Sequence, residues 1–347
     1  AGNASEPHSL TKQLKRPTRT KEYFIPAEAP VLITFCHHLQ DMPTDATDPF
    51  SPESFESFFD GPARRHLYDA ISLALHEDGP DMPPNAVFGP EETLHAEIVA
   101  KDDLVVAGLP LVPIILQESL AEADSLPCVY ESFARDGDRV AKGAVLAAIH
   151  GGARRILKAE RIILNFLCHL SGIATLTATY VDALKGTGIT LLDTRKTLPG
   201  LRYPEKYAVL MGGAKNHRKD LTEVLMLKDN HNDMAGSITR AVSKLREAYS
   251  PCPPIEVECR NEAEVREAVA CNVDWIMFDN MTTEEVTRVL GLVPKHIATE
   301  ISGGVSLDNI CPYAEAGKAG LTYISVGRLT HSAPYADCSM RIMKEQR

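Results

Sequence analysis

A regular alternation of β-rich runs and amphipathic segments over residues 189–326 constrains the fold of this chain most strongly. The predicted strands are residues 189–193, 223–228, 255–259, 275–279, 297–302 and 323–326. The helices predicted between them are residues 205–212, 237–249, 262–271, 283–290 and 307–316. Because neighbouring parallel strands need a crossover helix, these steps indicate a parallel sheet, and their regular period favours an α/β barrel over a doubly wound sheet.

The preceding residues have a mixed pattern that indicates an N-terminal α+β domain. A helix is predicted at residues 67–76 and a long one at 157–184, with strands at 93–100, 104–107, 128–133 and 144–149. At 347 residues, the chain is long enough for two domains. We expect an N-terminal extension, partly flexible, over residues 1–60, the α+β domain over 61–170 and the barrel domain over 171–330.

Composition argues against several classes of protein. The chain carries 36 Lys and Arg against 47 Asp and Glu, whereas nonspecific nucleic-acid binding needs a broad basic surface. No apolar run approaches the roughly 20 residues of a membrane span, and the polar residues 1–21 predict no signal peptide. The eight cysteines include no Cys-x-x-Cys pair and no zinc-ligand spacing, so we expect reduced thiols in a cytoplasmic protein.

Polar residues follow the predicted strands at the point where each strand ends. They are Asp193–Lys196, Lys228, Glu258, Asp279–Asn280, Ser302–Gly304 and Gly327–Arg328. Because the carboxyl ends of parallel strands share one face, where ligands bind, we expect these residues around a common mouth.

Residues 194–231 reverse the overall charge balance, with 8 Lys and Arg against 4 Asp and Glu. A local field opposite to the global one indicates a small anionic ligand. The candidate binding residues are Arg195, Lys196, His217, Arg218 and Lys228. Arginine holds a carboxylate or phosphate through paired hydrogen bonds, and lysine supplies a point charge. The alternative is a solvated basic face.

Two carboxylates, Glu258 and Asp279, follow strands beside these cations. They suit Mg²⁺ carried by a polyphosphate, or the hydroxyls and developing positive charge of a sugar. Salt bridges with the neighbouring cations are the alternative.

Glycine-rich turns follow the last two predicted strands. Ser302–Gly303–Gly304 precedes a helix expected near Ser306, and Gly327 is similarly placed. Backbone amides at a helix start bind phosphate and glycine permits close approach, although a plain turn is the alternative. The sequence contains no Walker-type phosphate loop, dinucleotide glycine fingerprint or nucleophile elbow.

Arg161 lies on an otherwise apolar predicted helix, in one stripe with Asn165 and His169. It is either a structural arginine with satisfied hydrogen bonds or a donor to a site, in this subunit or a neighbouring one.

These residues together resemble quinolinate phosphoribosyltransferase, the decarboxylating nicotinate-nucleotide pyrophosphorylase. The resemblance runs from residue 155 to 345, is looser over 65–155 and covers 1–60 poorly. It rests on DTRKTLPGLR at 193–202, NHR at 216–218, KDNH at 228–231, EVE at 256–258, FDN at 278–280, SGG at 302–304 and SVG at 325–327, with ER at 160–161 and SGIAT at 171–175.

The resemblance implies a type II phosphoribosyltransferase fold, an incomplete α/β barrel with an N-terminal α+β domain that residues 331–347 rejoin. It implies transfer of phosphoribosyl from phosphoribosyl pyrophosphate to quinolinate with Mg²⁺, giving nicotinate mononucleotide, pyrophosphate and CO₂. It also implies a homodimer, or a dimer of dimers or hexamer, in which Arg161 acts across the interface.

Residue roles follow from the same resemblance. The implied quinolinate ligands are Arg161, Arg195, His217, Arg218 and Lys228. Lys196 and Lys228 face the pyrophosphate, and Glu258 and Asp279 attend the ribose and Mg²⁺. The implied 5-phosphate ligands are Ser302, Gly303, Gly304 and Gly327. The implied catalytic residues are Lys196, Lys228, Glu258 and Asp279.

Three other functions fit parts of this pattern. A nicotinate phosphoribosyltransferase without decarboxylation shares the chemistry, although the density of cations favours a dicarboxylic acid. A barrel aldolase would use Lys228 as a Schiff base, but such a lysine is usually desolvated. A non-catalytic sensor of phosphorylated metabolites would keep the glycine turns without needing Glu258, Asp279 and Arg161 together.

Overall fold

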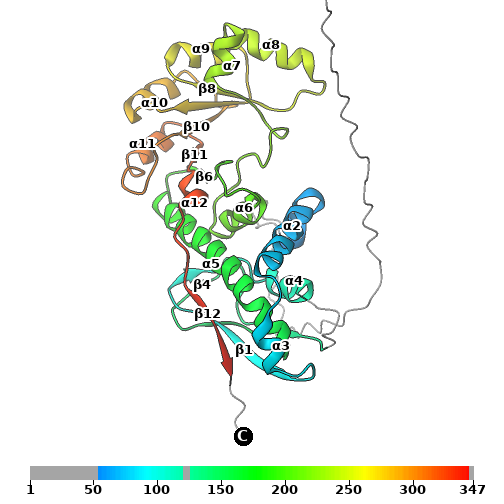
Figure 1. Ribbon diagram of the computed structural model, residues 1–347. Coiled ribbons are helices and arrows are strands. Elements are labelled where there is room, and N and C mark those ends of the chain that lie inside the picture. Colours follow the sequence, from blue (N-terminus) through cyan, green and yellow to red (C-terminus); the bar gives the residue numbers. More distant parts are fainter. Residues whose placement is uncertain (1–53, 120–125, 344–347) are drawn as a thin grey trace, which may run out of the picture. The chain divides into compact units, whose positions relative to one another are not determined.

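The structure of this chain is a computed structural model that describes residues 54–119 and 126–343 (Figure 1). The expected N-terminal extension therefore lies outside the described residues up to residue 53.

An antiparallel sheet occupies the N-terminal part of the described chain. Its strand order is β12 (Cys338–Met343), β1 (Thr93–Ala100), β5 (Val145–Gly152) and β3 (Val129–Ser132). Strand β12 pairs with β1 with Cys338 opposite Ala100, so segments far apart in the sequence share one sheet. A separate strand pair is formed by β2 (Leu104–Val105) and β4 (Arg139–Val140). The helices of this part are α1 (Phe55–Phe58), α2 (Gly61–Asp78), α3 (Met82–Val87) and α4 (Leu111–Glu118).

The long helix α5 (Ala153–Ala183) packs against elements of both the antiparallel and the parallel sheet (Figure 1). At Gly172 a Cβ atom would lie 2.0 Å from the carbonyl oxygen of Pro334, so only glycine lets these two backbones approach so closely. By length and composition α5 is apolar enough to cross a membrane, but 72% of its most apolar window is buried within the protein. It is therefore a core helix, and the expected domain boundary at residue 170 falls inside it.

A six-stranded parallel sheet follows α5. Its strand order is β6 (Thr190–Leu192), β11 (Tyr323–Ser325), β10 (Ala298–Ser302), β9 (Trp275–Asp279), β8 (Ile255–Cys259) and β7 (Leu225–Leu227). The helices are α6 (Arg202–Met211), α7 (Asp229–Ala235), α8 (Ile238–Ala248), α9 (Glu262–Ala270), α10 (Thr283–Leu290), α11 (Tyr313–Lys318) and α12 (Arg328–His331). All six strands lie at the predicted positions, and the chain has an α/β fold.

The edge strands β6 and β7 do not pair with each other in the described part of the chain. On the side of β6 that faces away from β11, the described residues form one isolated parallel bridge, between Leu192 and Lys215. The parallel sheet therefore remains open at this point, and the segment after α6 lies along its edge.

The helix predicted at 307–316 is wrong in its first half, because α11 begins only at Tyr313. The Asn309 side chain accepts a hydrogen bond from the Ser306 amide at 2.7 Å and donates one to the Gly304 carbonyl at 2.8 Å. These bonds hold the backbone in a turn, and Pro312 brings no N–H for an earlier helix. The helix expected near Ser306 is therefore absent.

Candidate active site

The carboxyl ends of the parallel strands meet at one edge of the sheet. Ser302 of β10 pairs in register with Asp279 of β9 on one side and with Ser325 of β11 on the other. Polar residues that lie 23 positions apart in the sequence thus become neighbours, as expected for a parallel sheet.

A cationic hollow of about 440 Å³ lies at the end of β7. Its lining residues are Arg195, Arg218, Leu221, Leu225, Met226, Leu227, Lys228, His231 and Leu245. The Arg218 guanidinium donates to the Val224 carbonyl at 2.8 Å, and its pKa is lowered by burial and by the nearby Arg195. Apolar walls combined with three cations suit a flat anion that carries its charge on the ring edge.

A second, glycine-rich hollow of about 180 Å³ lies at the ends of β10 and β11. Its lining residues are Thr194, Lys196, Ser302, Gly303, Gly304, Val305, Ser306, Ser325, Val326, Gly327, Arg328 and His331. The neighbours Arg195 and Lys196 therefore line different hollows. The Lys196 backbone is held by the Thr194 and Thr330 hydroxyls at 3.0 and 2.9 Å.

Glycine is required at one position of the glycine-rich hollow and leaves space at another. Gly303 has φ +98°, and a Cβ there would lie 2.5 Å from Asn280 Oδ1. A Cβ at Gly327 would lie 3.1 Å from the Lys196 side chain. The absence of side chains at these positions leaves room for a compact anion beside backbone amides and a lysine.

The carboxylate of Glu258 lies close to a cation of the cationic hollow and to the carboxylate of Asp279. Glu258 Oε2 lies 3.2 Å from Lys228 Nζ, so a salt bridge does form here. Burial raises the pKa of Glu258, and the opposite charge of Lys228 offsets part of that effect. Asp279 adds a second negative charge close by and accepts a hydrogen bond from Asn280 Nδ2 at 2.9 Å. The two carboxylates thus supply oxygen ligands of the kind that Mg²⁺ prefers.

His217 does not line either hollow but points into the sheet interior, with its side chain 5% exposed. Its Nε2 lies 3.2 Å from Glu256 and 3.5 Å from Glu300, and both carboxylates are fully buried. Burial opposes the charged ring, but hydrogen bonds to Glu256 and Glu300 outweigh burial and raise the pKa of His217 to about 10.

Backbone and side-chain contacts both fix the orientation of the His217 ring. The Arg218 amide donates to His217 Nδ1 at 2.7 Å. Nε2 carries a proton and faces the carboxylates of Glu256 and Glu300, whose hydrogen bonds raise the pKa of the ring. Although the three groups are close enough to hold a metal ion, a protonated Nε2 has no lone pair for one.

Arg161 lies exposed on α5 and lines neither hollow within the described chain. Of the predicted anion-binding residues, the structure brings Arg195, Arg218 and Lys228 together in one hollow and places Lys196 in the other. The sequence interpretation placed Asp193 among the polar residues at the strand ends without a role of its own and did not single out Lys206; the structure buries both side chains.

Comparison with protein families gives two adjoining matches. Residues 81–171 match the family described as "Quinolinate phosphoribosyl transferase, N-terminal domain", and residues 173–341 match its C-terminal domain. Together these matches cover most of the described chain.

Curated proteins give the same result. The chain is 41% identical over 263 residues to the probable nicotinate-nucleotide pyrophosphorylase (carboxylating) of Bacillus subtilis, covering 76% of this chain and 88% of the relative. It is 38% identical over 314 residues to quinolinate phosphoribosyltransferase (decarboxylating) 1b of Nicotiana tabacum, covering 84% and 87%. Among solved structures, NadC from Streptococcus pyogenes is 37% identical with a TM-score of 0.75, covering 82% of this chain and 99% of that one.

Proposed function

Because the chain belongs to the quinolinate phosphoribosyltransferase family, we propose that its two hollows hold the two substrates of one reaction. The protein is a decarboxylating phosphoribosyltransferase of NAD biosynthesis. It transfers phosphoribosyl from phosphoribosyl pyrophosphate to quinolinate and releases nicotinate mononucleotide, pyrophosphate and CO₂.

Quinolinate occupies the cationic hollow in this proposal. The observation that carries this assignment is the meeting of Arg195, Arg218 and Lys228 above apolar walls in a single hollow. A planar dicarboxylate matches both features, because its ring packs on leucine and methionine side chains while its carboxylates bind the cations. A monocarboxylate such as nicotinate would leave part of this charge without a partner.

Phosphoribosyl pyrophosphate spans from the glycine-rich hollow to Glu258 and Asp279. Its 5-phosphate fits the turn at Ser302, Gly303, Gly304 and Gly327, and its pyrophosphate faces Lys196 and Lys228. Glu258 and Asp279 fit Mg²⁺ through their oxygen donors, and the ion supplies charge neutralisation for the pyrophosphate. Chelation of Mg²⁺ is expected to stop turnover and its return to restore it.

Residues of the chain offset the charges that develop as the bonds change. Loss of pyrophosphate leaves the ribose anomeric carbon positive, and Glu258 and Asp279 offset that charge. The quinolinate nitrogen then forms the new C–N bond. The quaternary ring nitrogen accepts the electron pair of the C–C bond as CO₂ leaves, and a proton takes the vacated ring position. Fixed cations that hold the dianion in place therefore matter more than proton transfer by the protein.

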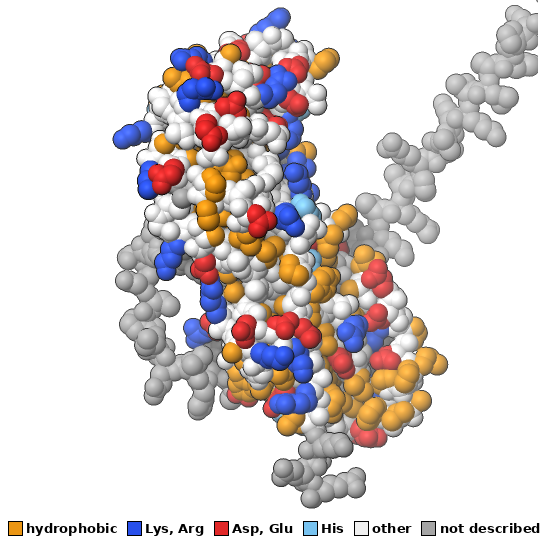
Figure 2. All heavy atoms as spheres, turned by 90° about the vertical axis from the view of Figure 1, so that its left-hand side faces the viewer, with side chains coloured by type: hydrophobic (Ala, Val, Ile, Leu, Met, Phe, Trp, Pro, Cys, Tyr) orange, Lys and Arg blue, Asp and Glu red, His pale blue; other side chains and the backbone are white. Residues whose placement is uncertain are grey.

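The assembly belongs to the proposal as well. We assign a homodimer, alone or within a dimer of dimers or a hexamer, in which Arg161 completes the quinolinate site of the partner subunit. Exposed apolar residues such as Val87 and Phe133 support an interface, and Figure 2 shows apolar side chains gathered over the lower part of the viewed face. Because α5 is buried as a core helix, we propose a soluble enzyme that is located in the cytoplasm.

An assay with quinolinate, phosphoribosyl pyrophosphate and Mg²⁺ tests the function. Stoichiometric nicotinate mononucleotide and CO₂ are expected, with no turnover of nicotinate. Turnover of nicotinate without CO₂ would favour the non-decarboxylating alternative. Borohydride trapping of a carbonyl compound on Lys228 would instead indicate an aldolase.

A further inference from the structure

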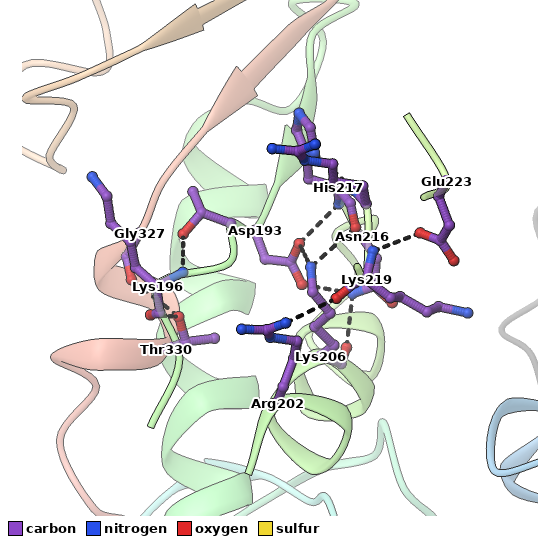
Figure 3. A network of polar contacts seen from close by, with 12 residues as sticks. Asp193, Lys196, Arg202, Lys206, Asn216, His217, Lys219, Glu223, Gly327 and Thr330 are labelled. Carbon is purple, nitrogen blue, oxygen red and sulfur yellow. Dashed lines mark hydrogen bonds and ion pairs between the residues drawn. The ribbon is translucent and has the colours of Figure 1, made fainter. Parts of the chain in front are cut away.

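A buried ion pair joins Asp193, at the end of β6, to Lys206 of α6, and both residues also bond to the loop that carries His217 (Figure 3). Lys206 Nζ donates to Asp193 Oδ1 at 2.5 Å and to the His217 carbonyl oxygen at 3.0 Å. Both side chains are 0% exposed. A lysine on α6 thus links the strand end to the following loop.

The remaining hydrogen bonds of Asp193 go to the same loop. The His217 amide donates to Asp193 Oδ1 at 2.8 Å, and Asn216 Nδ2 donates to Asp193 Oδ2 at 2.8 Å. Asn216 Nδ2 also donates to the Lys206 carbonyl at 2.9 Å. The loop is therefore fixed through its backbone and through a side chain (Figure 3).

This network lies where the parallel sheet is open. Regular pairing beside β6 ends with the single bridge between Leu192 and Lys215. Beyond that bridge, the side chains of Asp193 and Lys206 hold the end of β6 to the loop after α6. In a closed barrel, backbone hydrogen bonds to a further strand would do this.

The end of β6 and the loop after α6, which this network links, each carry one arginine of the cationic hollow. Arg195 follows Asp193 by two residues, and Arg218 directly follows His217. Both arginines line the cationic hollow, although like charges repel each other. Neither Asp193 nor Lys206 lines that hollow, so both act on a ligand only through the groups they hold.

Stability alone gives little reason for such a pair. Burial raises the pKa of Asp193 to about 6 against the attraction of Lys206, and burial lowers the pKa of Lys206. Desolvation therefore offsets much of the attraction, and buried pairs of this kind are often replaceable by uncharged residues without loss of stability.

We propose that Lys206 and Asp193 are positioning residues that set Arg195 and Arg218 at the separation a dicarboxylate requires. This inference rests on the assignment of the cationic hollow to quinolinate. It predicts an effect on quinolinate that is separate from folding and from phosphoribosyl pyrophosphate.

The double variant Lys206→Met with Asp193→Asn tests the proposal. It removes both charges while keeping the lysine stem volume and an acceptor for the His217 amide. We expect a cooperative melt near that of the wild type, a KM for quinolinate raised by about tenfold or more, and a KM for phosphoribosyl pyrophosphate changed by less than about threefold. Lys318→Met, at an exposed lysine of α11, is the matched control and should leave both values unchanged.

Equal KM values for quinolinate in the double variant and the wild type would overturn the proposal, as would a parallel rise for both substrates. If the double variant does not fold, Asn216→Ala decides, because it removes only the donor to Asp193 Oδ2 and to the Lys206 carbonyl. In Asn216→Ala, a severalfold rise in the KM for quinolinate alone supports the proposal, and an unchanged KM for quinolinate overturns it. Failure of the wild type to release CO₂ from quinolinate would count against the function instead.

Discussion

Lys228 Nζ lies 3.2 Å from Glu258 Oε2, so a cation of the cationic hollow is paired with the carboxylate that ends the neighbouring strand. The lysine side chain is 51% exposed, and such ion pairs are weak in water. Either partner can therefore turn to a substrate at small cost. This pair marks the boundary between the proposed quinolinate and phosphoribosyl pyrophosphate sites.

Removal of one arginine from the cationic hollow should affect the two substrates unequally. We expect Arg195→Ala to raise the KM for quinolinate by about 30-fold, because loss of a charged hydrogen-bond donor costs about 2 kcal/mol. The KM for phosphoribosyl pyrophosphate should change much less. Steady-state kinetics with each substrate varied in turn measures both, and Arg260→Ala, whose guanidinium pairs with Asp233 and Glu264, is the control. Equal losses for both substrates would contradict the assigned role.

Mixed dimers test whether Arg161 acts across the interface. At a quinolinate concentration near the wild-type KM, Arg161→Ala and Arg195→Ala chains should each show only a small fraction of the wild-type activity. When they are unfolded together and refolded, mixed dimers contain one site with both arginines, and part of the activity should return. Activity of the mixture is compared with that of each variant refolded separately. No recovery at any mixing ratio would exclude a shared site.

The glycine-rich hollow should respond to a single methyl group. Gly303→Ala places a Cβ 2.5 Å from Asn280 Oδ1 at φ +98°, so the turn must shift. We expect a raised KM for phosphoribosyl pyrophosphate with little change for quinolinate. Gly143→Ala is a matched control, since Gly143 has φ +91° with nothing within 4 Å and lies outside both hollows. A shift of the KM for phosphoribosyl pyrophosphate in both variants would show a general effect of backbone strain.

The pH dependence of stability should reveal a buried carboxyl group away from the site. Asp136 accepts hydrogen bonds from the Gly108 amide at 2.8 Å and the Tyr207 hydroxyl at 2.9 Å, yet burial raises its pKa to about 6. Because the folded value lies above the ordinary 3.8, its contribution is present below about pH 4 and is lost as pH rises through about 6.

Urea unfolding of the wild type and of Asp136→Asn between pH 4 and pH 7 measures this contribution. The stability advantage of the wild type over the variant should fall with rising pH. A constant or growing advantage would show that hydrogen bonds, not burial, dominate the pKa of this group.

The parallel sheet was predictable because its signals are local. The run from Ile255 to Cys259 and the run from Trp275 to Asp279 coincide with β8 and β9, since apolar strands bounded by turn residues are distinct from amphipathic helices. Helix α4 was not predicted, because Leu111–Glu118 is almost uniformly apolar and shows no helical period. The turn at Asn309 was missed since side-chain bonds to the backbone leave no periodic trace.

The candidate site was predictable only in part. Strand ends identified Arg195 and Lys228, and the excess of cations over residues 194–231 identified Arg218; the structure brings all three into one hollow. The sequence could not predict that Lys196 lines a different hollow from its neighbour Arg195. The directions of these two side chains depend on the backbone path after β6. The inward direction of the His217 side chain was not predictable either. It depends on Glu256 and Glu300, whose side chains are buried by the way β8 and β10 lie in the sheet.

A crystal structure with quinolinate bound tests the central claim most directly. We predict that the ligand lies in the cationic hollow, with its carboxylates within hydrogen-bonding distance of Arg195 and Arg218 and its ring against the leucine and methionine side chains. Quinolinate bound elsewhere, with these guanidinium groups turned away from it, would contradict the account.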